Sequence, residues 1–330
     1  MSNIRETLIN TKRSINNFVN LDVKTYLGYI NSNHPSLAIF EFGSIVDTDK
    51  FFVGTIGLPI HQVILRSFFA ANQQFCFWYD DIYGYKRTKY TSGSVNNICL
   101  NAKSLDDLKR DLKNSIITDA VNLRGERLEI LNLSFDYAAY LNDDPYDFDW
   151  LINHLYNFGP FHWDLFRKKA NYFIMDIIRY YKFVKNEDNK SIFDNIKGIN
   201  PDGYREKFIQ FVEKELLPYH LPAIDYQIPK CLRSMGIIIF PEKIEEEIKG
   251  VINKDSRVEL LIRSTSYLAL NIIHNKIRTQ RLNNLKLSGE SLDELTYDQV
   301  SITHEEIDGR LFFDRDSFKM AAHKCVTTHY

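Results

Sequence analysis

The sequence predicts a mainly α fold, of the α+β type, with a small β element in its N-terminal half. Apolar residues recur at helical spacing over most of the chain, which is typical of amphipathic helices. Only residues 37–58 and the ring-dense segment 75–93 break that pattern. With 44% hydrophobic and 25% charged residues, the 330-residue chain resembles an ordinary globular protein and is long enough to bury a large core.

In the first 149 residues, helical and extended patterns alternate. Helices are expected at 4–19, 22–30, 61–74, 104–116 and 128–141. Between them, LAIFEF alternates in polarity and FFVGTIG is rich in β-formers, so we expect short strands or extended loops within 37–58. The segment FCFWYDDIYGYKRTKYTSG (75–93) is expected to form a hairpin or an irregular sheet.

The second half of the chain is more uniformly helical. Between 166 and 181 an apolar stripe faces one way, whereas Lys168, Tyr172 and Asp176 share the other face. The Asp-rich loop 141–149 is the expected boundary between an N-terminal lobe, 1–149, and a helical lobe, 150–330, unless the two form one compact unit.

Two helix starts in this half have clear signals. Residues 226–235 can form one helix closed by Gly236, with Pro229 tolerated in its first turn because amide donors there lack intrahelical partners. Ser256 and Glu259 have the spacing of a capping box and begin the most regular apolar stripe in the chain.

Charge and composition narrow the class of partner. The formal net charge of −2 lacks the basic footprint usual for proteins that bind duplex DNA, which favours a small substrate. The N-terminus has no apolar export core, and no apolar run approaches the roughly 18 residues of a membrane span. Four widely spaced cysteines fit buried or free thiols in a reducing compartment. We therefore expect a cytoplasmic protein without a membrane partner.

The segment LPAIDYQIPKCLRSMGII (221–238) resembles the queuosine-salvage family of queuosine 5′-phosphate N-glycosylases, which are related in fold to helix-hairpin-helix DNA glycosylases. The matching residues are Asp225, Tyr226, Pro229, Leu232, Arg233 and Gly236. FRKKANYFIMDI (166–177) is similar to the family's Lys-basic-Ala helix, and FCFW (75–78) to its aromatic segment. Glu259 and Arg263 fit its late Glu-to-Arg helix. The resemblance implies a DNA-glycosylase-like helical fold.

Departures from the family lie on the side that reads the base. The family's Gly-Tyr-Trp run and Leu-Asn-Arg element correspond to YTSGSVNNICLNAKS here, without the Trp or the Arg. The acidic residue usually found just upstream of the aromatic segment is replaced within FAANQQ (69–74). Retention of the acid and the lysine beside these losses indicates the same bond chemistry on a different base.

The resemblance makes Asp225 the candidate catalytic carboxylate. Cleavage of a nucleoside C1′–N bond develops oxocarbenium charge, which a nearby carboxylate stabilises while it orients or deprotonates the attacking water. On the residues alone, an Asp just before a helix is most often an N-cap, and the two roles are compatible. Lys168, the second candidate, would orient Asp225, contact a phosphate or ribose, or stabilise the departing base; the alternative is a solvated lysine.

Candidate substrate-binding residues come from the aromatic segment and from the helices after Asp225. Phe75, Phe77 and Trp78 would sandwich a base, and Asp80 or Asp81 would accept hydrogen bonds from its ring N–H groups. For each ring, packing in the core is the competing interpretation. The sugar or phosphate would be bound by Tyr226, Arg233 and Arg263; for Arg263 the alternative is simple surface exposure.

No metal or cofactor is expected. The acidic cluster at Asp143, Asp144, Asp147 and Asp149 lacks the spacing of a calcium loop, and a solvated loop is the simpler interpretation. The nine histidines are scattered without the spacing of a zinc site.

Three functional hypotheses follow. The first is an N-glycosylase that hydrolyses a modified nucleoside or nucleotide such as queuosine 5′-phosphate. The second is a DNA glycosylase that flips out and removes a modified base, such as a hypermodified base of phage DNA, with phosphate contacts from KRTK (86–89) and NKIRTQRLNNLK (275–286). The third is a non-catalytic nucleoside-binding module.

Overall fold

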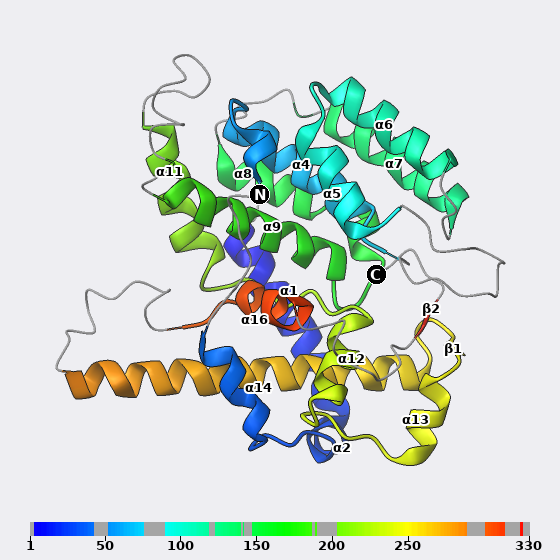
Figure 1. Ribbon diagram of the computed structural model, residues 1–330, viewed down its shortest axis with the longest axis vertical. Coiled ribbons are helices and arrows are strands. Elements are labelled where there is room, and N and C mark those ends of the chain that lie inside the picture. The colour runs from blue at the N-terminus through cyan, green and yellow to red at the C-terminus, as the bar shows by residue number, and fades with distance from the viewer. Residues whose placement is uncertain are drawn as a thin grey trace. The chain divides into compact units, whose positions relative to one another are not determined.

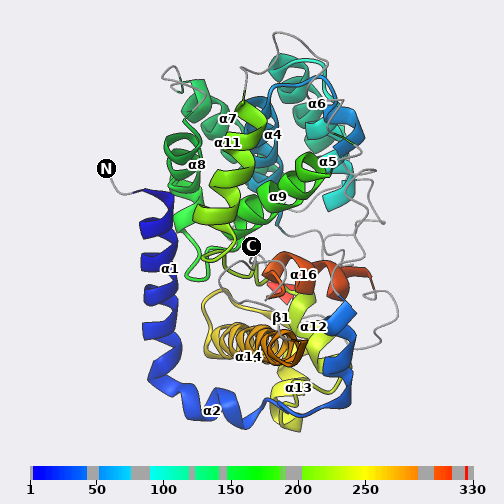
Figure 2. The ribbon, with the colours of Figure 1, turned by 90° about the vertical axis from the view of Figure 1, so that its left-hand side faces the viewer.

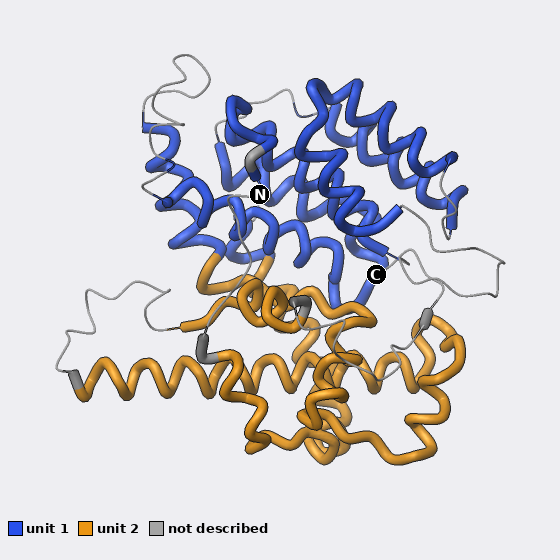
Figure 3. Tube along the Cα trace, viewed as in Figure 1, with its two compact units in different colours: residues 1–7, 47–216, 327–330 blue, residues 8–46, 217–326 orange. Residues whose placement is uncertain are grey.

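A computed structural model of the chain contains two compact units (Figures 1 and 3). Unit 1 comprises residues 1–7, 47–216 and 327–330, and unit 2 comprises 8–46 and 217–326. The structure describes residues 3–42, 52–75, 90–118, 123–139, 141, 147–186, 189, 203–288, 301–313 and 324–325. Among these residues nearly all regular structure is helical, which confirms the mainly α prediction.

Unit 1 is built around two helices, α4 (Ile60–Asn72) and α9 (Lys168–Lys185), which pack against each other. Around them lie η3 (Val53–Thr55), α5 (Ser92–Asn101), α6 (Leu105–Thr118), α7 (Arg124–Ala139), α8 (Phe148–Tyr156), η5 (Gly159–His162), α11 (Tyr204–Phe211) and the π-helical turn η7 (Val212–Leu216). The helix expected at 128–141 is therefore present, as α7.

Aromatic residues fill the interior of unit 1. Phe68 of α4 contacts the rings of Phe69, Phe158, Phe161 and Phe173, with ring centroids 5.2 to 6.1 Å apart. Most of these pairs are edge-to-face, the arrangement that the charge distribution of an aromatic ring favours. Much of the chain's aromatic content therefore serves packing.

Unit 2 surrounds the long helix α14 (Arg257–Ser288), which Figure 2 shows nearly end-on. Its other elements are the later part of α1 (Ile4–Val19), η1 (Asn20–Asp22), α2 (Val23–Gly28), η2 (Pro35–Phe42), α12 (Gln227–Ser234), α13 (Glu242–Ile248), α16 (His304–Phe313) and the parallel pair β1 (Val251–Ile252) and β2 (Lys324–Cys325). Helices α2, α12, α13 and α16 contact α14. The helix starts expected near 226 and 256 are confirmed.

The strands expected within 37–58 are not found in the described part of that stretch. Residues 35–42 and 53–55 form 3-10 helix instead. The turn begins directly after His34, whose carbonyl oxygen accepts the Leu37 N–H at 3.1 Å, and the short alternating pattern has no partner strand there to pair with. The described strands are β1 and β2, near the other end of the chain. Most of the segment 75–93 lies outside the described residues.

The division into units differs from the expected boundary at 149/150. Helices from both sides of that position, α4 and α9, form the centre of unit 1. The Asp-rich loop is tied into the same unit, because Asp147 caps α8 through the Trp150 N–H and Asp149 accepts the Ile4 N–H. Where it is described, this loop therefore provides helix caps.

None of the described helices is both long enough and apolar enough to cross a lipid bilayer.

Three histidines of unit 2 meet in a buried cluster. The His274 and His304 rings are stacked 5.0 Å apart, and His220 meets His304 edge-on at 5.3 Å. The backbone N–H of His304 donates to Nε2 of His220 at 2.7 Å, so that nitrogen must be unprotonated. Burial lowers the pKa of His274; burial, two neighbouring imidazoles and the Lys12 ammonium hold the pKa of His304 well below its usual value.

This cluster predicts acid sensitivity. The unfolded chain binds more protons than the folded chain between the lowered folded pKa values and the usual 6.5. The free energy of unfolding should therefore be highest above about pH 6.5 and should fall below it, by up to about 1.4 kcal/mol per pH unit for each such group. His304→Phe keeps a stacked ring but cannot titrate, so urea unfolding at pH 7.5, 6.5 and 5.5 should show a shallower decline. Equal slopes for the variant and the parent would contradict this account.

Candidate functional site

Asp225 stands at the start of α12 and accepts two backbone hydrogen bonds. Its Oδ1 receives the N–H groups of Gln227 at 2.7 Å and Ile228 at 3.2 Å, the pattern of an N-cap residue. The side chain is half-buried. Within the described part of the chain, Oδ2 of Asp225 makes no hydrogen bond or ion pair, so one oxygen anchors the carboxylate while the other is available.

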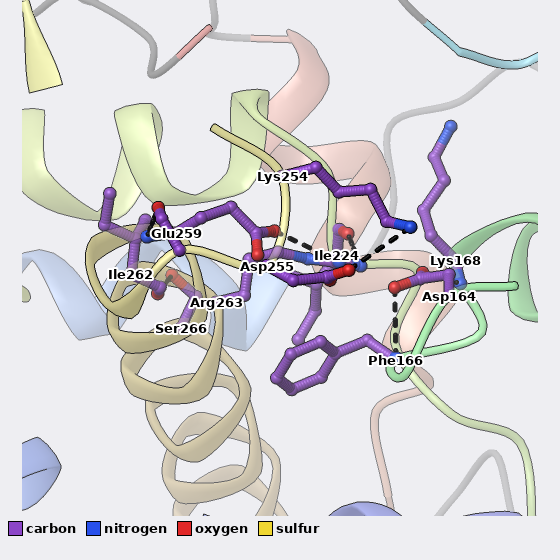
Figure 4. A network of polar contacts seen from close by, with 11 residues as sticks. Asp164, Phe166, Lys168, Ile224, Lys254, Asp255, Glu259, Ile262, Arg263 and Ser266 are labelled. Carbon is purple, nitrogen blue, oxygen red and sulfur yellow. Dashed lines mark hydrogen bonds and ion pairs between the residues drawn. The ribbon is translucent and has the colours of Figure 1, made fainter. Parts of the chain in front are cut away.

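The peptide just before Asp225 is held by a buried arginine from α14. Nη2 of Arg263 donates to the Ile224 carbonyl oxygen at 3.0 Å, and Nη1 donates to Oε1 of Glu259 at 3.3 Å. Both side chains of this ion pair are almost fully buried, with exposures of 2% and 0%. Figure 4 shows Glu259 and Arg263 extending from the same helix towards Ile224. The pair therefore fixes the backbone that carries the catalytic candidate.

This contact revises the expectation for Arg263. The sequence suggested either a surface position or a contact with sugar or phosphate. In the structure Arg263 is 1% exposed, and its guanidinium donates hydrogen bonds to protein groups. Glu259 was expected to form a capping box with Ser256 and, from the family resemblance, to share a helix with Arg263. Its backbone N–H does donate to Ser256 Oγ at 3.3 Å, but its carboxylate pairs with Arg263. Four-residue spacing on one helix is the sequence signal that could have indicated this pair.

Arg233 is likewise committed to the protein. Its guanidinium makes a two-point ion pair with Glu245, through Nε to Oε1 at 3.0 Å and through Nη2 to Oε2. The pair joins α12 to α13, and the Arg233 side chain is only 2% exposed. The expected substrate contact is therefore replaced by a brace at the far end of the helix that Asp225 caps. Tyr226, the next candidate, is buried with 8% exposure.

Lys168 belongs to unit 1, where it begins α9. Its backbone N–H donates to Oδ2 of Asp164 at 2.7 Å, and Asp164 Oδ1 also accepts the Phe166 N–H at 3.2 Å. The ammonium donates to the Gln74 carbonyl oxygen at 2.6 Å and lies 5.2 Å from the centre of the Tyr172 ring. With 4% exposure, Lys168 is not the solvated surface lysine that the amphipathic pattern allowed.

Phe75 lies among cations rather than at an open surface. Its ring is 1% exposed, with the Arg127 guanidinium 4.0 Å and the Lys169 ammonium 4.2 Å from its centre. These contacts are of the cation–π type and account for the packing of this ring. The other expected base-reading residues, Phe77, Trp78, Asp80 and Asp81, lie outside the described residues.

The two candidate catalytic residues are thus held in place by different sets of contacts. Asp225, Glu259 and Arg263 are brought together in unit 2, and Lys168 is grouped with Asp164 and Gln74 in unit 1. The sequence analysis missed Asp164. A cap is expected immediately before the first helical residue, so an acidic residue four positions before Lys168 carried no clear signal.

In the described ranges no group of three or more histidine, cysteine or acidic side chains is arranged to hold a metal ion. Cys99 and Cys231 are buried thiols without a disulfide, as the sequence suggested for the cysteines in general. Comparison of the chain with models of known protein families and with curated proteins finds no match.

The Glu259–Arg263 pair predicts a strong dependence of stability on each partner. Arg263→Met removes the buried cation that pairs with the Glu259 carboxylate, which should cost about 3–5 kcal/mol of unfolding free energy. Glu259→Gln together with Arg263→Met removes both charges and should recover part of that loss, as measured by urea unfolding. A single-variant loss below about 1 kcal/mol would show that the pair does not hold this segment.

Proposed function

We propose that this chain hydrolyses the N-glycosidic bond of a modified nucleoside or nucleotide, with Asp225 as the catalytic carboxylate. The observation that carries the proposal is the unequal bonding of the two Asp225 oxygens: Oδ1 is fixed by two backbone N–H groups, and Oδ2 is unbonded in the described part of the chain. A carboxylate oriented in this way is suited to face positive charge that develops on a sugar.

In the proposed reaction, the C1′–N bond breaks and its electron pair leaves with the base. The ribose becomes oxocarbenium-like, and the negative Oδ2 stabilises it electrostatically. Water then adds to C1′ and passes a proton through Asp225 towards the departing base. The products are the free base and the sugar, with or without its phosphate.

Rigid placement of the carboxylate supports this role. A negatively charged carboxylate is the form that can stabilise an oxocarbenium ion. The Ile224 carbonyl contact with Arg263 restrains the backbone on one side of Asp225, and α12 restrains it on the other. Little reorganisation would then accompany the chemical step.

Lys168 is proposed as the second catalytic residue. It is a buried cation, and its Nζ already lies in a polar environment that includes the Gln74 carbonyl oxygen. A cation of this kind can stabilise negative charge on a leaving base or on a phosphate. The resemblance to the queuosine-salvage family makes queuosine 5′-phosphate the first substrate to test.

Asp225→Asn should abolish base release without unfolding the protein. Asn serves as an N-cap about as well as Asp, so the helix start is preserved while the charge is lost. We expect kcat to fall by at least about 100-fold for whichever substrate is active, with free base followed by mass spectrometry and the thermal unfolding midpoint nearly unchanged. The substrates are queuosine 5′-phosphate and, separately, duplex DNA containing modified bases, in which alkali cleavage reports abasic sites.

The same experiment separates the three functional hypotheses. Full activity of Asp225→Asn would remove the residue from its proposed role. Tight binding of a nucleoside without base release by the parent protein would favour the non-catalytic binding module. Base release from DNA but not from the nucleotide would identify a DNA glycosylase.

Lys168→Met should lower kcat by at least about tenfold, because a neutral side chain cannot stabilise the departing base or a phosphate. Lys185→Met is the matched control, since Lys185 is a half-buried lysine of the same helix whose ammonium pairs with Glu213, away from Gln74. Initial rates and thermal unfolding midpoints would be measured for both variants. Equal activity losses in the two would contradict the assignment of Lys168.

A further inference from the structure

The C-terminal end of α14 projects from unit 2. No residue from Arg278 to Leu287 is buried, although the helix before it is almost entirely buried from Leu261 to Tyr267. Figure 1 shows this end, in orange, extending past the other described helices of unit 2. We call residues 278–287 the projecting end of α14. Arg281, Leu282 and Leu285 are half-buried, and Arg281 donates to the Ser301 carbonyl oxygen at 2.5 Å, whereas the other positions of this end are exposed. An exposed helix face gains little from core packing, so its composition reflects another requirement.

The composition of this helix is strongly one-sided in charge. The stretch 260–288 contains no Asp or Glu, although the whole chain has 43 acidic residues against 41 basic ones. Four basic residues lie in its second half: Lys276, Arg278, Arg281 and Lys286. Basic residues near a helix C-terminus also interact favourably with the helix dipole, but that effect is confined to the last turn. The dipole effect therefore does not explain why 29 consecutive residues contain no Asp or Glu.

A second acid-free element lies beside this helix in unit 2. Residues 7–21, which form most of α1, contain Lys12 and Arg13 and no acidic residue. Tyr267 of α14 donates its hydroxyl to Asn16 of α1 at 2.9 Å, so the two helices are in contact. Partial burial and the nearby Arg278 guanidinium lower the pKa of Lys12, which places like charges from both helices close together. Like charges concentrated without acids form a patch that attracts polyanions.

The surface of α14 also carries a row of amide side chains. A shallow groove of about 530 Å³ lies along it. The groove is lined by Asn275, Lys276, Thr279, Gln280, Asn283 and Asn284. Amide side chains donate and accept hydrogen bonds at once, and Asn or Gln can bind the major-groove edge of adenine in a two-point contact. Such side chains can contact base edges and phosphates.

From these observations we propose that the projecting end of α14 binds duplex DNA by lying in the major groove. An α-helix with its side chains is about 10–12 Å across, and the major groove of B-DNA is about 12 Å wide. The deep, narrow major groove of A-form RNA does not admit a helix in this way. Arg278 and Lys286 contact phosphates, while the groove amides face base edges. This binding does not depend on the proposed hydrolysis; together the two would make a nucleoside within DNA the substrate.

The test measures binding of the full-length protein to a fluorescently labelled 20-base-pair DNA duplex by anisotropy over a range of salt concentrations. Arg278→Gln with Lys286→Gln should weaken binding at least about tenfold at low salt. It should also reduce the slope of log K against log salt by about 2, one for each lost phosphate contact. The matched control is Lys243→Gln with Lys249→Gln, which removes two exposed cations, one within the Glu-rich helix α13 and one directly after it, and should leave binding unchanged.

Several results would overturn the proposal: no duplex binding by the parent protein, equal losses in both double variants, or tighter binding to A-form duplex RNA than to DNA. Association of the protein with itself through this helix, abolished by Arg278→Gln with Lys286→Gln, would also overturn it. Asp225→Asn should keep its DNA affinity. DNA binding without base release from any substrate would therefore refute the proposed hydrolysis alone, and hydrolysis of a free nucleotide without DNA binding would refute this inference alone.

Discussion

The candidate site depends on one buried guanidinium, that of Arg263. It links Glu259 on its own helix to the carbonyl oxygen of Ile224, and so connects the longest helix of unit 2 to the peptide that precedes Asp225. A buried charge is costly unless it is paired and hydrogen-bonded. Loss of any one of these three groups should therefore destabilise the contacts of the other two. The position of the Asp225 backbone is thereby determined by residues more than thirty positions away in the sequence.

Unit 1 uses buried cations in a related way, at the C-terminal ends of helices. Arg127 donates to the carbonyl oxygens of Gln73 and Phe75, and Lys168 donates to that of Gln74, so the end of α4 is closed by two cations. Arg66 donates to the Cys99 and Ala102 carbonyls at the end of α5. The last carbonyls of a helix have no partners within it and carry partial negative charge, which explains why cations are stable here.

These contacts bear on both proposals. Residues that end helices inside a unit are rigid, so a carboxylate at the start of α12 and a lysine at the start of α9 are held by structure rather than by a ligand. The projecting end of α14 is the opposite case. It presents exposed charged and hydrogen-bonding side chains over most of its last turns, and Arg281 anchors it to the Ser301 carbonyl oxygen.

The helices of this protein were largely predictable from the chain alone, because apolar spacing and capping residues act within a few positions of each other. That local information placed α6, α7, α12 and the start of α14, and it singled out Asp225 as a cap. Local pattern failed at Leu37–Phe42, since a strand forms only where another strand lies alongside it.

The roles of the arginines were settled by the three-dimensional structure. Arg233 and Arg263 looked like surface or ligand-binding residues, yet each is paired with a glutamate and buried, Arg233 against a glutamate 12 positions away. The division into units likewise joins helices from both sides of the Asp-rich loop. Sequence spacing reports which side chains share a helix face, whereas burial and long-range pairing depend on what the folded chain brings against that face.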